Sequence, residues 1–160
     1  MGREGIDWGR YLSLEAGAMG RKDLDYVGYM EGDIELKLPG GSAVFRVFHP
    51  GGGTSYAHSY QAQKIVESFQ GGEKPGAMLV GHYHKAGYWM VRNVHVLLAG
   101  CAEDQTSFMR KKHIEAQVGW WTLEIQQDAN GAIRRFSPTN NNHYDRGYHI
   151  VATDTPAIVV

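Results

Sequence analysis

Two histidines separated by one residue are the strongest candidates for chemistry in this sequence. His82 and His84 follow a short apolar run, residues 78–80, and a glycine, Gly81. A short apolar run that ends in glycine is typical of a buried strand that reaches the edge of a sheet. In extended backbone, side chains two residues apart point to the same side, so both imidazoles are expected to converge while Tyr83 points away. Neutral imidazole is the commonest metal ligand in proteins, which favours a divalent-metal site; the alternative is two exposed histidines in a turn.

A third histidine lies between another apolar run and a glycine-rich loop. His49 follows residues 44–48, which are rich in β-branched and aromatic side chains, and precedes three consecutive glycines. A glycine loop that leads into a helix presents backbone N–H groups and suits a bound phosphate. The candidates for phosphate or substrate binding are therefore the glycines beside the histidines: Gly51, Gly52, Gly53 and Gly81.

The elements that position these residues alternate between strand and helix. Apolar residues at helical spacing predict a helix over about residues 55–69, with Thr54 or Ser55 as its N-cap. The chain order is therefore strand, histidine, helix, strand and histidine pair. Such an order places two histidine-bearing strand ends in neighbouring positions of one sheet, where α/β proteins bind their ligands.

The remaining pattern predicts more strands than helices. Residues 33–38 alternate between apolar and polar and form a hairpin with residues 44–48 through a glycine-containing turn at 39–42. Further strands are predicted over residues 94–98, 118–125, 132–136 and 148–152. The expected fold class is α/β or α+β, a mixed sheet in a β-sandwich arrangement with one main flanking helix. Residues 1–32 are expected to form a lead-in, 33–137 the domain, and 138–160 a tail.

Composition narrows the functional classes. The 160-residue chain is 42% apolar and 21% charged, with a net charge of −1, so no general attraction to nucleic acid or membranes is expected. Its single cysteine excludes an internal disulfide framework and fits a reducing compartment. No leader pattern opens the sequence and no apolar run is long enough to span a bilayer, so a cytoplasmic location and no membrane partner are expected.

The order of these motifs resembles the C-terminal half of the calcineurin-like metallophosphoesterases. That family ends its active-site pattern with a strand-terminal histidine followed by Gly-His-x-His, which here are His49 and residues 81–84. A strand that closes on Gly-Ser follows in the family, and this chain has Gly100 and Cys101 in the corresponding place. The resemblance covers roughly residues 33–137.

The resemblance implies a dinuclear metal centre of Mn, Fe or Zn ions that hydrolyses phosphoesters with a metal-bound hydroxide. By resemblance, His49 and His82 would bind one ion and His84 the other. Cys101 and Asp104 are candidates for the border of the site. The expected substrate is a phosphodiester or phosphomonoester. Nucleic acid is one candidate class, because residues 108–113 form a local basic patch.

The sequence departs from the family in its other motifs. It contains no Asp-x-His, and neither Gly32-Asp33 nor Asn142-His143 is in the register that the N-terminal family motifs require. No general-acid histidine can therefore be assigned. The expectation is a C-terminal half, from a truncated chain or a split pair, completed by a partner chain or by self-association. The alternative is a non-catalytic interaction domain that keeps the fold.

Overall fold

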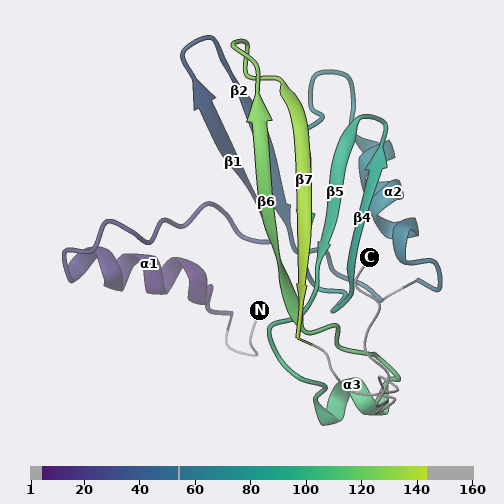
Figure 1. The fold of residues 1–160 in the computed structure, drawn as a ribbon. Coiled ribbons are helices and arrows are strands. Elements are labelled where there is room, and N and C mark those ends of the chain that lie inside the picture. Colours follow the sequence, from purple (N-terminus) through teal and green to yellow (C-terminus); the bar gives the residue numbers. More distant parts are fainter. Residues whose placement is uncertain (1–4, 54, 144–160) are drawn as a thin grey trace, which may run out of the picture.

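A five-stranded mixed sheet forms the centre of the computed structural model, which describes residues 5–53 and 55–143 (Figure 1). The strand order is β1-β2-β3-β5-β4, in which β2, β3 and β5 run parallel and the edge strands β1 and β4 are antiparallel to their neighbours. A mixed sheet with one main helix confirms the predicted α+β class. The strands are β1 (Glu31–Leu38), β2 (Gly41–Phe48), β3 (Ala77–Val80), β4 (Ala86–Val91) and β5 (Val94–Ala99).

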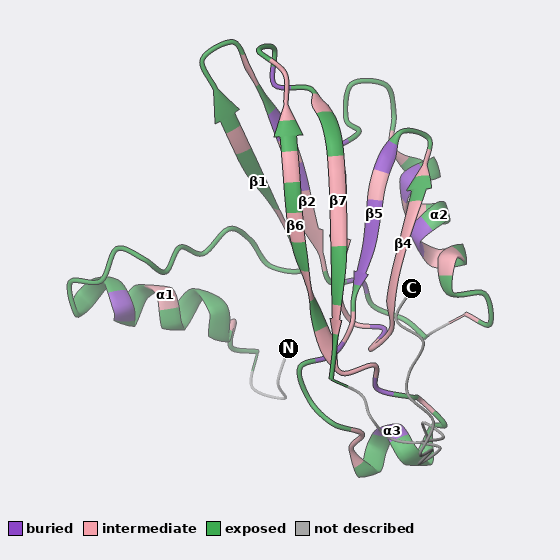
Figure 2. Cartoon of the chain, in the orientation of Figure 1, coloured by how far each residue is buried: buried purple, intermediate pink, exposed green. Residues whose placement is uncertain are grey.

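Helix α2 (His58–Ser68) connects β2 to β3 and covers one face of the sheet (Figure 1). Its inward side chains Ala62 and Val66 are fully buried against β3 and β5, and β5 is buried along most of its length (Figure 2). The helix begins three residues later than the earliest predicted start. The prediction of a Ser55 cap was wrong, because Ala57 is the N-cap and the Ser55 hydroxyl donates to the Ala57 carbonyl at 2.7 Å. Thr54, the other predicted cap, lies outside the described residues.

A two-stranded ribbon, β6 (Gly119–Gln127) and β7 (Ile133–Asn142), lies over the other face of the sheet (Figure 1). A second apolar core fills the interface, where Phe45 of β2 stacks on Phe136 of β7 with ring centroids 6.2 Å apart. The ribbon turn lies so close to the β1–β2 turn that a Cβ at Gly41 would be 2.1 Å from the carbonyl oxygen of Asn130. Glycine is therefore required where the two hairpin turns meet.

Strand β7 is longer than the sequence pattern indicates. The predicted return strand ended at Phe136, but β7 continues past Pro138, which pairs with Leu123. Both strands of a two-stranded ribbon are edges, and an edge strand tolerates a proline that cannot donate a ladder hydrogen bond. The boundary predicted for the tail therefore falls inside a strand. The strand predicted over residues 148–152 lies outside the described residues.

Helix α1 (Trp8–Ala18) extends away from the two sheets (Figure 1). The apolar residues of this segment form only a weak helical stripe, yet the Asp7 side chain caps the helix by accepting from the Arg10 N–H at 3.2 Å. Its large apolar side chains remain exposed, among them Trp8 (53%), Leu12 (56%) and Leu14 (65%). None of the described helices is long and apolar enough to cross a membrane.

Candidate metal centre

Three parallel strands end at the same edge of the sheet and deliver the candidate residues there. Phe48 of β2 pairs with Val80 of β3, and Val80 pairs with Leu98 of β5. His49, the histidine pair and Cys101 follow these three positions within a few residues. The predicted adjacency of the histidine-bearing strand ends is confirmed by this register.

The histidine pair reaches the site in a bend, not in extended backbone. His82 has φ 76° and His84 has φ 57°, both in the left-handed region, so the expected extended geometry was wrong. A left-handed conformation costs a residue with a Cβ about 1–2 kcal/mol, which the surrounding packing must offset. Tyr83 is 6% exposed and packs in the core beneath α2. Its ring centroid nevertheless lies 5.5 Å from that of His82, and it lines the pocket described below, so it does not turn fully away from the pair.

His82 lies beside His49. Their ring centroids are 5.0 Å apart with the rings at 72°. The Nε2 of His82 lies 2.8 Å from the carbonyl oxygen of Gly52, and a carbonyl can only accept, so Nε2 carries the proton and Nδ1 keeps its lone pair. Burial lowers the pKa of His49, and the neighbouring rings of His82 and His84 lower it further. The His49 ring is therefore suited to the neutral form that binds a metal.

The predicted substrate-binding glycines take different places. Gly52 and Gly53 line the pocket described below, whereas Gly51 and Gly81 do not. Gly81 lies against the histidine instead, because a Cβ there would be 3.2 Å from Nδ1 of His49. Its missing side chain thus leaves room for the His49 ring.

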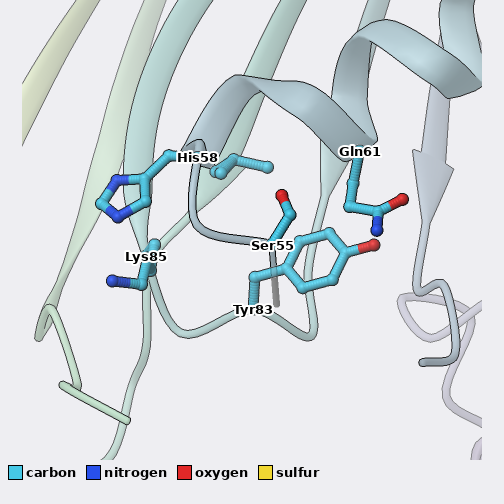
Figure 3. A pocket seen from close by; sticks show the side chains of 6 residues that line it. Ser55, His58, Gln61, Tyr83 and Lys85 are labelled. Atoms are coloured by element: carbon cyan, nitrogen blue, oxygen red, sulfur yellow. The ribbon is translucent and has the colours of Figure 1, made fainter. Parts of the chain in front are cut away.

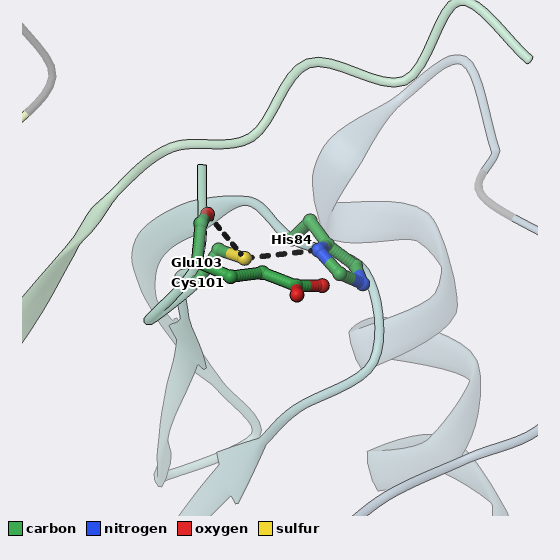
Figure 4. A group of neighbouring side chains, drawn as sticks. All are labelled: His84, Cys101 and Glu103. Atoms are coloured by element: carbon green, nitrogen blue, oxygen red, sulfur yellow. Dashed lines mark hydrogen bonds between the residues drawn. The ribbon is translucent and has the colours of Figure 1, made fainter. Parts of the chain in front are cut away.

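His84 belongs to a separate group with Cys101 and Glu103 (Figure 4). Its Nδ1 is 3.0 Å from the Cys101 sulfur, and that thiol lies 3.1 Å from the Glu103 backbone carbonyl, to which it donates. One ligand atom from each of the three residues lies within 4.8 Å of the others, and no other such trio occurs among residues 5–53 and 55–143. His49, His82 and His84 therefore do not converge on one point.

Glu103 takes the place at the site that the sequence assigned to Asp104. The Asp104 carboxylate accepts from the Gln105 N–H at 2.7 Å, and Asp104 does not line the pocket. Glu103 lies two residues after Cys101, the same spacing as in the histidine pair, and this spacing was the available signal.

A pocket of about 430 Å³ opens beside both groups. His82, His84 and Glu103 form one side, and the short helix α3 (Ser107–Lys111) with the following Lys112 forms another. This volume suits a small organic ligand. Lys112 comes from the predicted basic patch and places a positive charge at the pocket.

A second hollow, at the start of α2, is too small for a substrate. Figure 3 shows Ser55, His58, Gln61 and Tyr83 around it, and its volume of about 10 Å³ matches a single water molecule. His58 therefore lies apart from the candidate centre.

Comparison of the chain with protein-family models, with curated proteins and with solved structures finds no match. What the site can do must therefore be argued from its own residues. It combines an imidazole pair, an imidazole–thiol–carboxylate group and a lysine around one pocket. Those groups can bind divalent cations and an anionic ligand.

Proposed function

We propose that this chain contributes the histidine-bearing half of a metal-dependent phosphoesterase of the calcineurin-like type. The observation that carries the proposal is the arrival of His49, His82 and His84 at the ends of adjacent parallel strands, beside a pocket lined by a lysine. Parallel strand ends are the usual place for catalytic ligands in such sheets.

In this proposal, the chain's own residues orient the metal-binding imidazoles and hold the phosphoryl group of the substrate. The Gly52 carbonyl fixes the tautomer of His82, as backbone carbonyls commonly do for metal-binding histidines. Lys112 offsets the negative charge of a phosphoryl group in the pocket. A divalent ion of Mn, Fe or Zn, when bound, lowers the pKa of water and polarises phosphoryl oxygens.

The imidazole pair requires further ligands before it can hold a dinuclear centre. Within the described part of the chain, no carboxylate joins His49 and His82 in a trio of close ligand atoms. Two dications in contact repel strongly unless anionic ligands neutralise them. We therefore propose that a partner chain, or another segment, supplies the bridging carboxylate.

Manganese binding tests this proposal directly. Mn²⁺ should broaden the imidazole NMR signals of His49 and His82 through its unpaired electrons, while His95, near the opposite end of β5, serves as the control. Unbroadened signals from the pair at millimolar Mn²⁺ would contradict a metal role. The chain alone should hydrolyse an aryl phosphodiester negligibly, and robust turnover that is lost in His84→Ala would show that no further ligand is needed.

A second candidate is a non-catalytic interaction module that self-associates. The exposed apolar side chains of α1 favour it, because the helix extends away from both sheets and leaves its apolar surface in water (Figure 1). In this case, the proposed occupant of the α1 apolar surface is a second copy of the chain.

A further inference from the structure

We propose that His84, Cys101 and Glu103 form a zinc site that is distinct from the His49–His82 pair. We refer to these three residues as the thiolate group. The proposal goes beyond the phosphoesterase function, because the resemblance assigns no sulfur ligand. It would hold even if the chain hydrolysed no phosphoester.

The geometry of the thiolate group needs little change to accept an ion. A tetrahedral zinc lies about 2.3 Å from a thiolate and about 2.0–2.1 Å from an imidazole nitrogen, which places these two ligand atoms about 3.5 Å apart. The Cys101 sulfur and the His84 Nδ1 are 3.0 Å apart, so they must separate by only about half an ångström. Glu103 lies in an exposed turn, where its carboxylate can complete the set.

The backbone that carries two of the ligands is held from both sides. The His84 carbonyl accepts from the Gln117 N–H at 2.9 Å, and the Gln117 carbonyl accepts from the Cys101 N–H at 3.0 Å. Cys101 also forms a bridge with Val118, and its side chain packs against Met109 and Ala116 in a small core. Residue 117 thus links the two ligand-bearing segments at a fixed separation.

The charge of the thiolate group distinguishes it from the imidazole pair. When an ion binds, the Cys101 thiol releases its proton to solvent, and the resulting thiolate and the carboxylate carry two negative charges that balance a dication. Two neutral imidazoles carry no charge. Thiolate is a soft ligand that selects Zn²⁺ over Mn²⁺ or Mg²⁺. The thiolate group is therefore expected to bind zinc without any partner.

Access for a further ligand comes from the pocket. His84 and Glu103 both line the 430 Å³ pocket, whereas Cys101 is 7% exposed and lies behind them. Three protein ligands and a fourth position open to a cavity are characteristic of zinc sites that also bind water or substrate, while structural sites are closed by four protein ligands. A small anionic ligand could therefore reach the ion.

The test is Zn²⁺ and Co²⁺ titration of the untagged, reduced, metal-free chain. We expect one Zn²⁺ per chain by calorimetry, and a near-ultraviolet sulfur-to-cobalt charge-transfer band with Co²⁺. Cys101→Ser should abolish that band and weaken zinc binding by about 100-fold or more, and Glu103→Gln should weaken it at least about tenfold. Asp104→Asn, which changes the adjacent carboxylate, should leave both measurements unchanged, and His49→Ala should leave the cobalt band unchanged.

Several results would overturn the proposal. They are a wild-type chain without the cobalt band, a band that persists in Cys101→Ser, and zinc binding that Asp104→Asn weakens as much as Glu103→Gln does. Glu103 is exposed, so its variant keeps the test decisive if replacement of the buried cysteine prevents folding. Loss of the cobalt band in His49→Ala would also contradict the proposal, because it would merge the two sites.

Discussion

Replacing Gly81 with alanine should displace the His49 ring while leaving the stability of the fold almost unchanged. An added Cβ would lie 3.2 Å from Nδ1 of His49, closer than ordinary van der Waals contact, so the ring must retreat by a few tenths of an ångström. Gly81 does not have a positive φ, so alanine is allowed there and should stabilise by about 0.4–1 kcal/mol through the unfolded chain. The close contact offsets part of this effect, and the free energy of unfolding should change by less than about 1 kcal/mol.

Urea denaturation and imidazole NMR measure the two halves of this prediction. Gly81→Ala should shift the ring signals of His49 and weaken Mn²⁺ binding by the His49–His82 pair on the order of tenfold. Gly51→Ala is the matched control, because it makes the same change in the neighbouring loop, where no heavy atom of another described residue lies within 4 Å of the added Cβ. The control should leave the ring signals and the manganese affinity unchanged.

The reasoning would be refuted by equal effects of the two alanine substitutions on His49. It would also fail if Gly81→Ala lowered the free energy of unfolding by more than about 2 kcal/mol. Such a loss would mean that the ring cannot retreat and that the strand end itself is strained.

Two further predictions concern parts of the fold remote from the histidine pair. Burial lowers the pKa of His95 from its usual 6.5, so the unfolded chain binds the proton more readily. The stabilisation due to the neutral ring is therefore fully present above pH 6.5 and is lost as the pH falls through the pKa of the folded state. In urea denaturation, the free energy of unfolding of His95→Gln should fall less steeply with decreasing pH than that of the wild-type chain. If α1 mediates self-association, sedimentation velocity should show a concentration-dependent dimer, and the double variant Leu12→Ser with Leu14→Ser should abolish it. Met90→Ser, which changes an exposed side chain on the sheet, is the control and should leave the dimer intact. A dimer unaffected by the α1 changes would contradict this role.

The positions of the strand ends could be predicted because they follow from chain order alone. A strand, helix and strand in succession form a right-handed crossover between parallel neighbours, and this places His49 near His82 without knowledge of any contact. The same rule does not predict in which direction a side chain points once the strand has ended. The left-handed φ angles of His82 and His84 follow from packing, with Tyr83 drawn into the core beneath α2.

Other differences arise where distant contacts decide the local structure. The region after Phe136 reads as a polar tail, yet pairing with β6 keeps it extended as far as Asn142. The sequence pattern does not predict β4, because its side chains do not alternate between apolar and polar and nearly all of them are half-buried. The prediction named Asp104 in place of Glu103, because a two-residue spacing after Cys101 favours Glu103 only once Cys101 itself is known to face His84.

The parallel pairing of β2, β3 and β5 bears on the order in which the molecule assembles. The hairpins β1–β2 and β4–β5 join strands that are adjacent in the sequence and need little loop closure, whereas β2 and β3 must meet across the whole of residues 49–76. Contacts between remote segments form slowly and set the folding rate of such topologies. The imidazoles therefore meet only after the slow step, and a ligand that requires both His49 and His82 would report the finished fold rather than an early intermediate.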